Sequence, residues 1–378
     1  MDWRVALTEI ELIEADVEAA MSVLDSEWLT MGPRTQQLEL AFAESVGTEH
    51  AVAVSSCTAA LHLACLAAGV GPGDEVIVPA MTFVATANGP RHCGAGVVLG
   101  ESASPTDPNL DPNDVAARIT PQTKAVMAVH LCGYPADLEA LRSLCSQRDL
   151  VLIEDCAQAA GGRTADGRAL GSVGDLGCFS FFSKTQLGVG EGGIVVTDDA
   201  DLAARVRSLR SHAMTSVTWD RHRGHAETYD VTDLGFNYRI DELRAAMAQA
   251  RLERLPAAIE GLRGVAHGYR EALAGADGIE LPFDADAVEH SGHFAFPVLV
   301  ADGETRDSVR AKMHDNGVQT TFYPALTLLS AYLPEGTAGA RPLAEEFSAR
   351  HIALPFFPAL DEDRIELVVS ELRSALLQ

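Results

Sequence analysis

Short apolar runs alternate with longer amphipathic stretches between residue 51 and about residue 200, and no other feature of the chain limits the fold as strongly. Such short apolar runs are typical of buried strands, and the stretches between them are typical of helices that connect parallel strands. We expect strands at 51–54, 75–79, 96–99, 125–130, 150–154, 178–182 and 193–197, and helices at 58–68, 82–92, 111–119, 137–148 and 200–212. The pattern predicts an α/β protein with a mainly parallel, seven-stranded sheet.

The sequence changes character after about residue 250. A helix is expected from Ile240 to about Leu255, and Pro256 marks its interruption or kink, because proline removes a helical hydrogen bond. A strand at 294–300 and helices at 306–316 and 364–377 follow. Since 378 residues suffice for two or three domains, we expect a large domain over residues 1–250 and a smaller α+β domain over residues 251–378.

The chain is strongly acidic, with 28 Lys and Arg residues against 54 Asp and Glu residues and a formal net charge of −26. This charge disfavours nucleic-acid binding, and an anionic substrate would have to be held by a few arginines and by helix N-termini. No secretory signal is visible, and polar residues interrupt the longest apolar region, 51–70, which argues against a membrane span. We expect a cytoplasmic protein with no membrane or nucleic-acid partner.

Neither the cysteines nor the clustered histidines predict a metal site. The seven cysteines lack Cys-x-x-Cys spacing and lie mostly in apolar segments, so we interpret them as reduced core residues. His212, His222 and His225 fall on or beside the polar segment 215–238, which we interpret as a long functional loop, and no cysteine stands beside them.

Lysine is scarce, and one of the three lysines differs from the others. Lys124 opens an apolar strand and Lys312 lies in a polar helix, so we interpret both as surface charges. Lys184 follows an apolar strand and precedes the glycine-rich stretch 188–193. Burial at a strand end would favour the neutral amine, which is a nucleophile. The alternative is a surface lysine at a strand end.

Upstream of Lys184, a buried-strand pattern ends in Glu154 and Asp155. Carboxylates at the carboxyl ends of strands lie where open α/β sheets bind ligands. An acid there can hold a protonated pyridine nitrogen and so make a bound heteroaromatic ring an electron sink. An aspartate that caps the N-terminus of a helix is the alternative interpretation.

The strand at 51–54 passes through small hydroxyl residues directly into a helix. The backbone N–H groups of Thr58 and Ala59 would then point toward an anion, although an ordinary Ser or Thr N-cap explains the pattern equally well. Phe83 offers a stacking face, but a single phenylalanine is more often a core residue. The lysine, the acid and the turn together are the three parts that a site for pyridoxal 5'-phosphate (PLP) needs.

Over about residues 7–375 the chain resembles the fold-type I, PLP-dependent sugar aminotransferases of the DegT/DnrJ/EryC1/StrS family. The matching stretches occur in the order of the family and are 27–34, 58–61, 71–79, 82–86, 153–158, 188–193 and 235–239. The resemblance implies a large PLP-binding domain around the seven-stranded sheet and a smaller C-terminal α+β domain.

The resemblance also implies a role for each matching residue at the cofactor ring. Lys184 would bind PLP covalently and act as general acid and base, and Asp155 would pair with the pyridine nitrogen. Gln158 would lie near the phenolic oxygen of PLP, and Phe83 would stack on its ring.

The phosphate of PLP would be bound by the backbone amides of Thr58 and Ala59 and by the Ser183 hydroxyl. In the family, the asparagine at the position of Asn237 reaches the phosphate of the neighbouring subunit. A homodimer with shared active sites is therefore implied.

Two positions depart from the family pattern. Cys57 stands where glycine is usual, just before the phosphate turn. In the segment that begins at Tyr323, which we expect to contact substrate, Thr327 replaces a frequent histidine.

By resemblance, the substrate is a nucleotide-linked keto-deoxysugar, most plausibly a 4-keto-6-deoxyhexose, and glutamate or glutamine is the amino donor. Arg221, Arg223 and Arg239 are the densest supply of cations for the anionic groups of these substrates. Two alternatives stay open: an aminotransferase for a cyclitol ketone and a PLP-binding regulatory protein without turnover. Lys184 argues against a third, a sugar dehydratase of the same fold, because that branch has histidine in place of the lysine.

Overall fold

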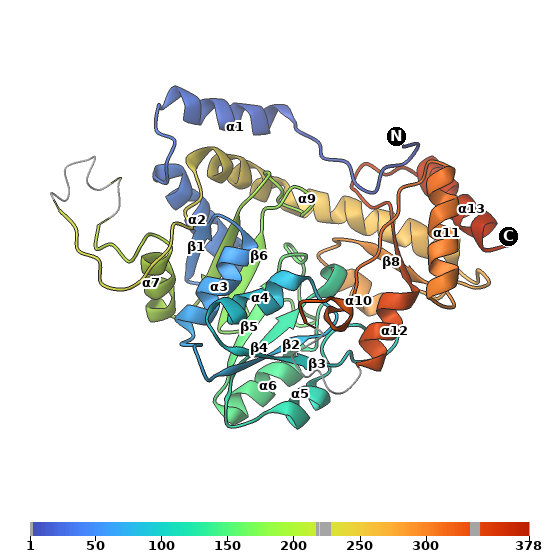
Figure 1. The fold of residues 1–378 in the computed structure, drawn as a ribbon. Coiled ribbons are helices and arrows are strands. Elements are labelled where there is room, and N and C mark those ends of the chain that lie inside the picture. The colour runs from blue at the N-terminus through green and yellow to red at the C-terminus, as the bar shows by residue number, and fades with distance from the viewer. Residues whose placement is uncertain (1–2, 217–218, 220–227, 333–340, 378) are drawn as a thin grey trace.

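A computed structural model describes residues 3–216, 219, 228–332 and 341–377 and contains one large sheet (Figure 1). Its strands run in the order β1-β7-β6-β5-β4-β2-β3. β7 is antiparallel to both of its neighbours, and the other neighbouring strands are parallel. The bounds are β1 His50–Val54, β2 Glu75–Pro79, β3 Gly96–Gly100, β4 Thr123–Val129, β5 Val151–Cys156, β6 Leu176–Ser180 and β7 Gly193–Thr197.

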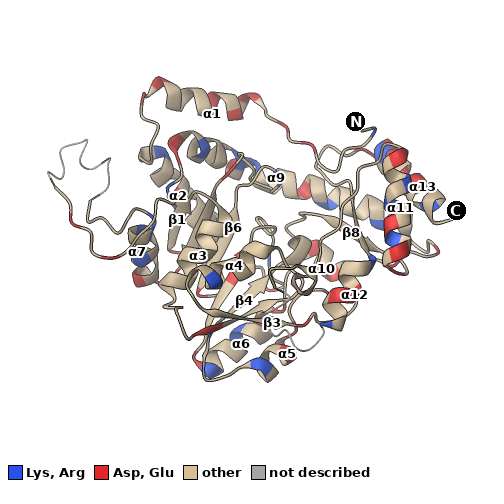
Figure 2. Cartoon of the chain, viewed as in Figure 1, with Lys and Arg blue, Asp and Glu red and all other residues tan. Residues whose placement is uncertain are grey.

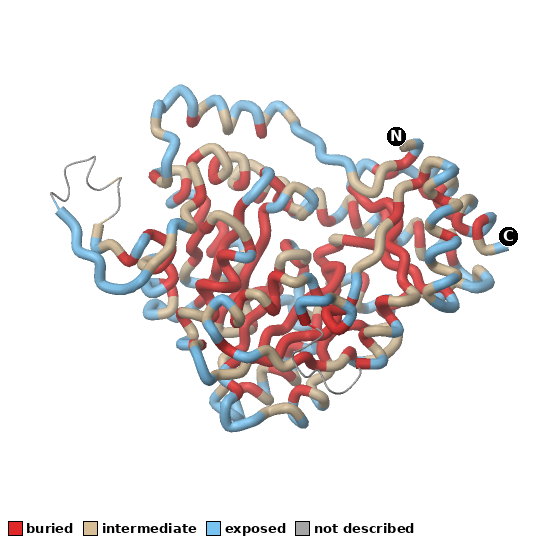
Figure 3. The backbone as a smooth tube through the Cα atoms, viewed as in Figure 1, coloured by how far each residue is buried: buried red, intermediate tan, exposed pale blue. Residues whose placement is uncertain are grey.

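The prediction of a mainly parallel, seven-stranded sheet is confirmed, and each expected strand overlaps the observed one. The strands form the core of the molecule, as the concentration of buried chain in Figure 3 shows. Charged residues belong mainly to the surrounding helices and loops (Figure 2). The five expected helices are also found, as α3 (Cys57–Ala67), α4 (Val84–His92), α5 (Pro112–Arg118), α6 (Leu138–Arg148) and α7 (Ala200–Leu209).

The strand order determines which helices cover which face of the sheet. Crossovers between parallel strands are right-handed, so the connections that run toward β3, through α3 and α4, cover one face. The connections that run back toward β5, through α5 and α6, cover the other. The carboxyl ends of β2, β4, β5 and β6 consequently meet at one edge, where polar residues follow each strand.

The expected interruption at Pro256 is wrong. A single 32-residue helix, α9 (Glu242–Leu273), passes through this proline. On both sides of it the helix buries apolar residues such as Leu252 and Ile259, and it packs against α1 (Glu14–Asp25) and α2 (Pro33–Val46). This packing outweighs the cost of the missing hydrogen bond, about 3 kcal/mol. The division after residue 250 falls inside α9 and stays a prediction.

The C-terminal part forms a second, smaller sheet with helices around it. β8 (Phe296–Leu299) and β9 (His351–Leu354) pair antiparallel. The helices are α10 (Ala285–His290), α11 (Gly303–Asp315), α12 (Pro342–Arg350) and α13 (Glu362–Leu376). The α+β character expected of this part is confirmed. No helix in the described ranges has both the length and the apolar character needed to cross a bilayer.

Candidate active site

Asp155 lies at the carboxyl end of β5, opposite Cys178 on β6, and its side chain is buried. One carboxylate oxygen accepts a hydrogen bond from Thr86 Oγ1 at 2.8 Å and the other accepts one from the Ala157 N–H at 3.1 Å. Thr82 Oγ1 lies 2.7 Å from Thr86 Oγ1 and extends this chain of hydroxyls. Burial raises the pKa of Asp155, and the bonds from Thr86 and Ala157 partly oppose this.

A buried carboxylate at this place suits a cationic partner. The chain turns after β5 and forms no helix before β6, so the alternative of a helix N-cap for Asp155 is wrong.

The neighbouring acid, Glu154, has a structural role that the sequence did not reveal. His130 Nδ1 accepts a bond from the Ala136 N–H, so Nε2 carries the proton and donates to Glu154 at 3.0 Å. Three backbone N–H groups between residues 171 and 174 donate to the same carboxylate. Burial alone would raise the pKa of Glu154, but His130 and these amides hold it below its ordinary value.

His130, Glu154 and Cys156 also place their ligating atoms within 4.8 Å of one another, as a metal site would require. The hydrogen bonds of His130 and Glu154 are satisfied without an ion, and they fix the loop that leads from β5 to β6.

Lys184 lies on a tight loop after β6. The Phe181 N–H donates to the Gly192 carbonyl and the Val189 N–H donates to the Phe181 carbonyl, both at 2.9 Å, so the chain folds back on itself. A Cβ at Gly188 would lie 2.5 Å from the Ser183 carbonyl oxygen, which explains the glycine. Lys184 itself is exposed, so the protein alone does not provide the burial that we expected. The loop instead holds a solvent-accessible amine beside the strand end that carries Asp155.

The turn between β1 and α3 matches the expected phosphate site in part. Thr58 is exposed in the first turn of α3. The Ala59 N–H donates to Ser56 Oγ at 3.1 Å, so the Ser N-cap interpretation is confirmed, and this amide would have to be shared with an anion.

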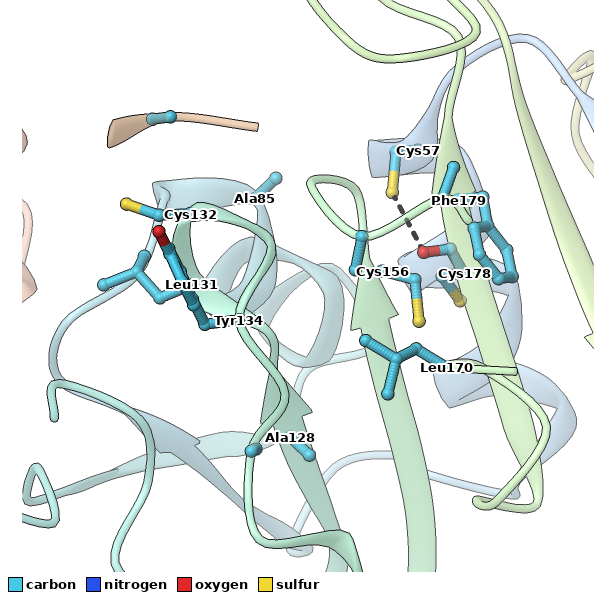
Figure 4. Packing of buried hydrophobic residues seen from close by; sticks show 14 of the residues in the cluster. Cys57, Ala85, Ala128, Leu131, Cys132, Tyr134, Cys156, Leu170, Cys178 and Phe179 are labelled. Carbon is cyan, nitrogen blue, oxygen red and sulfur yellow. Dashed lines mark hydrogen bonds between the residues drawn. The ribbon is translucent and has the colours of Figure 1, made fainter. Parts of the chain in front are cut away.

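Cys57 points its sulfur away from the turn, 3.7 Å from the Cys178 carbonyl oxygen, as Figure 4 shows. The replacement of glycine by Cys57 therefore leaves the turn open, because the side chain packs into the core.

Gln158 and the Lys184 loop are tied together by Gln186. Gln186 Nε2 donates to the Gln158 carbonyl at 2.8 Å and to the Gly292 carbonyl at 2.5 Å. Gln158 Oε1 accepts a bond from the Cys132 N–H at 2.6 Å, which directs the side chain along the loop after β4. The contact of Gln186 with Gly292 joins the lysine loop to the segment before β8.

Phe83, the N-cap residue of α4, is 69% exposed, so it is not a core residue. Its exposed ring is available to stack on the ring of a bound ligand. The Tyr323 N–H donates to His351 Nε2 at 2.8 Å, and the two rings stack with centroids 5.6 Å apart. Burial, with a smaller contribution from Cys132, raises the pKa of Tyr323.

Thr327 is buried, and its hydroxyl has no hydrogen-bond partner within the described residues. The neighbouring Leu326 N–H donates to the Ala80 carbonyl at 2.8 Å, which places this segment beside the end of β2.

Of the residues expected from the long loop, the structure describes two. Asn237 is exposed beside Ser211, and Arg239 is half-buried. The Tyr238 carbonyl between them accepts a bond from the Ser55 N–H at 2.8 Å, so both flank the turn before α3. Burial and the neighbouring Arg210 lower the pKa of Arg239. Arg221 and Arg223 lie outside the described residues.

The residues at this edge fit PLP. The buried carboxylate of Asp155 can pair with a cation, and the exposed ring of Phe83 can stack on another ring. The N-terminus of α3, with the exposed Thr58, can bind a phosphate. Lys184 adds an accessible amine. These are the chemical groups that the ring, the phosphate and the aldehyde of PLP require.

Comparison with known proteins agrees with this geometry. The sequence matches the DegT/DnrJ/EryC1/StrS aminotransferase family over residues 11–373. It is 37% identical over 359 residues to the UDP-N-acetyl-3-dehydro-alpha-D-glucosamine 3-aminotransferase of Acidithiobacillus ferrooxidans, with 94% of this chain and 92% of that protein covered. It is 35% identical over 367 residues to the spore coat polysaccharide biosynthesis protein SpsC of Bacillus subtilis, with 95% and 93% covered.

Among solved structures, the aminotransferase TlmJ from Streptoalloteichus hindustanus superposes with a TM-score of 0.91 at 36% identity, covering 100% of this chain and 99% of that one. The chain therefore belongs to the DegT/DnrJ/EryC1/StrS aminotransferase family. It is a PLP-dependent sugar aminotransferase of fold type I that takes part in amino sugar synthesis.

Proposed function

We propose that the enzyme transfers an amino group from glutamate or glutamine to a nucleotide-linked keto-deoxysugar. The observation that carries this proposal is the placement of the buried Asp155 at the end of β5 and of the exposed Lys184 on the loop after the adjacent parallel strand β6. Bound PLP supplies an electron sink for the carbon that exchanges the amine. Lys184 Nζ anchors the cofactor and then carries the proton to and from that carbon.

The other residues hold the cofactor in place for this proton transfer. Asp155 keeps a proton on the pyridine nitrogen, which it can do as a carboxylate held by Thr86 and the Ala157 amide. Thr58, Ala59 and Ser183 bind the phosphate, Phe83 stacks on the ring, and Gln158 lies beside its oxygen substituent. The accessible position of Phe83 and Lys184 supports this arrangement.

We also propose that the site is completed by Asn237 from a second copy of the chain. Large apolar side chains stand exposed on α1 and on the segment before Asn237, namely Val17, Met21, Leu24, Tyr229, Val231 and Leu234. Such a surface is typical of a region that another subunit covers. A homodimer would bury it and bring Asn237 to the neighbouring site.

Arg221, Arg223, Arg239 and Tyr323 are proposed to contact the substrates. Both the carboxylate of the donor and the diphosphate of a sugar nucleotide are anions, and the chain carries a net charge of −26. Because the net negative charge of the protein repels these anions, arginines at the site are needed to bind them. Arg239 beside the turn before α3 is suitably placed.

The position of the keto group separates two candidates. The resemblance favours a 4-keto-6-deoxyhexose, and the name of the Acidithiobacillus relative favours a 3-keto sugar linked to UDP. The test is to load the enzyme with pyridoxamine phosphate and offer both classes of keto-sugar nucleotide. The productive substrate should restore the absorbance of PLP and yield the amino sugar. If neither sugar nucleotide reacts, the proposal fails.

Two controls separate the remaining alternatives. Isothermal calorimetry with UDP and dTDP should detect binding, whereas an enzyme for a free cyclitol ketone would bind neither. Addition of glutamate or glutamine should convert the PLP form into the pyridoxamine form, whereas a regulatory protein would leave the spectrum unchanged. The dehydratase alternative conflicts with Lys184, because that branch has histidine at this position.

A further inference from the structure

Cys93 differs from the other six cysteines of the chain. It alone is partly exposed, and the other six are buried. It is the C-cap residue of α4, outside the cofactor site, and no step of the proposed reaction uses it. We propose that Cys93 is a peroxide-sensitive thiol that forms a reversible disulfide with Cys65 on α3.

The packing of α3 against α4 brings the two cysteines together. Both helices follow parallel strands and run in the same direction. A Cβ at Gly89 would lie 3.3 Å from the Leu61 backbone, so the helices are in close contact at these residues. Cys65 and Cys93 each lie four residues further along, which is one turn on the same face. The Cys93 sulfur accordingly lies 3.9 Å from the carbonyl oxygen of His62, on the turn of α3 that leads to Cys65, and the two thiols affect each other's pKa.

The surroundings of Cys93 favour the thiolate. Two histidines lie nearby, because His92 precedes Cys93 in the chain and the His62 and His92 ring centroids are 5.6 Å apart. The hydrogen bond from Cys65 lowers the pKa of Cys93 to about 6, because together with His62 and His92 it outweighs the opposing effect of burial. Burial raises the pKa of Cys65. Cys93 is thus the attacking thiol and Cys65 the resolving thiol.

The reaction needs a hydroperoxide as oxidant, with hydrogen peroxide as the simplest member of the class. The Cys93 thiolate attacks one peroxide oxygen, the O–O bond breaks, and a sulfenic acid and one water form after protonation. The Cys65 sulfur then attacks the Cys93 sulfur, the S–O bond breaks, and a second water leaves. Two thiols lose two electrons and two protons in total, and one peroxide becomes two waters. A thiol reductant reverses the oxidation by exchange.

This disulfide would join the two helices that begin at the cofactor site. α3 starts at the turn with Thr58, and α4 starts at Phe83. A link between them constrains how the phosphate turn and the stacking ring move relative to each other. This second step rests on the proposed roles of Thr58 and Phe83, and the formation of the disulfide does not.

The experiment uses the PLP-loaded enzyme in its native assembly. Brief alkylation with iodoacetamide at pH 7 should modify Cys93 about tenfold faster than any other cysteine, because most of it is thiolate at that pH. A few equivalents of hydrogen peroxide should give a peptide pair linked through Cys93 and Cys65, two hydrogens lighter than the sum of the free peptides, that dithiothreitol separates. Equal alkylation of all cysteines, or a link between other cysteines, would overturn the proposal.

Variants provide the controls. Cys65→Ser, which keeps a hydrogen-bond donor beside Cys93 but cannot form a disulfide, should stop the reaction at a Cys93 sulfenic acid, which dimedone traps, and Cys93→Ser should prevent both products. Cys145→Ser, at a buried cysteine on α6, should change nothing. Trapping at Cys65 in the Cys93→Ser variant would contradict the assigned order. The alkylated and cross-linked peptides are identified in the unmodified protein. The proposal can therefore be tested even if one of the variants fails to fold.

The dissociation constant of PLP before and after oxidation tests the link to the cofactor site. It should change severalfold in the unmodified protein and not in Cys93→Ser. If the disulfide forms and the dissociation constant of PLP is unchanged, the proposed effect on the cofactor site is wrong, but the proposed disulfide between Cys93 and Cys65 is still supported. A failure of the aminotransferase assay alone would affect neither result.

Discussion

At the scale of single residues, the carboxylate of Asp155 depends on a hydroxyl that comes from a different element. Thr86, on α4, donates to Asp155 Oδ2 and opposes the effect of burial on the pKa. Thr86 is therefore a positioning residue for the acid that is proposed to hold the pyridine nitrogen.

Replacement of Thr86 by valine keeps the shape and removes the hydroxyl. A hydrogen bond to a charged group contributes roughly 1.5–3 kcal/mol, so we expect PLP to bind at least about tenfold more weakly. The pKa of Asp155 should rise further, because the charged form loses a donor. Equilibrium titration of the apoenzyme with PLP measures the first effect. Thr86→Ser, which retains the donor, should restore most of the affinity, and an equal loss in both variants would contradict this role.

His351 makes the unfolding free energy depend on pH. Nδ1 donates to the Phe347 carbonyl and Nε2 accepts from the Tyr323 N–H, and the bond that Nε2 accepts requires the neutral ring. Burial lowers the pKa of His351 to about 4. The unfolded chain protonates near pH 6.5, so it binds the extra proton, and stability should decrease as the pH falls from about 6.5 toward 4.

The expected contribution of His351 is up to about 1.4 kcal/mol per pH unit in this range. His351→Gln can still accept from Tyr323 and does not titrate, so its unfolding free energy should fall less steeply over the same range. Urea denaturation at several pH values measures both slopes. His293, which is also buried and has a pKa lowered to about 4, stays in the variant and contributes to the remaining slope, as do carboxyl groups whose pKa the fold lowers, such as Glu154. Identical slopes in the two proteins would refute this assignment.

The sequence predicted candidate site residues that stand beside a recognisable strand pattern. It did not predict interactions between residues that are far apart in the chain. Lys184 and Asp155 could be singled out as candidates because Asp155 lies at the end of one buried strand and Lys184 follows another after a few residues. The network of Glu154 could not, because its donors, His130 and the 171–174 amides, come from segments that become neighbours only in the fold. The exposed position of Lys184 was likewise not visible in a strand pattern that suggested burial.

At the scale of elements, the strands were predictable because most of them, such as β5 and β7, are buried along nearly their whole length and consist mainly of apolar residues. α9 was not, because local propensity places a helix end at Pro256 and tertiary contacts override it. β9 was missed because its four residues follow α12 without a loop or turn signal between them.

The passage of α9 through Pro256 predicts that this proline lowers stability. Pro256 is exposed, and an alanine there would supply the N–H that the Leu252 carbonyl lacks. We expect Pro256→Ala to raise the unfolding free energy by roughly 1–2 kcal/mol, since the gain in the helix exceeds the entropy that proline removes from the unfolded chain. Urea denaturation measures the change. Ala257→Pro, at the next exposed position, should destabilise the protein, and a Pro256→Ala variant weaker than the parent would contradict the reasoning.

At the scale of the whole molecule, the proposed sharing of active sites between two copies of the chain can be tested through residues in two different segments. Lys184 is on the loop after β6, and Asn237 is exposed beside the apolar segment 229–234. If two copies share their sites, each site contains Lys184 from one copy and Asn237 from the other. Lys184→Ala and Asn237→Ala should each lower activity, the first to background and the second through weaker cofactor binding.

Mixed dimers of the two variants provide the decisive test of shared sites. In such a dimer, one site combines both substitutions and the other has both native residues, because the native Lys184 and the native Asn237 come from different copies. Random exchange makes half of the dimers mixed, so about a quarter of all sites should regain full activity. If Asn237 served the site of its own subunit, every site would carry one substitution, and mixing would restore nothing beyond the average of the two variants. Activity measured after refolding the variants separately and together distinguishes the two arrangements.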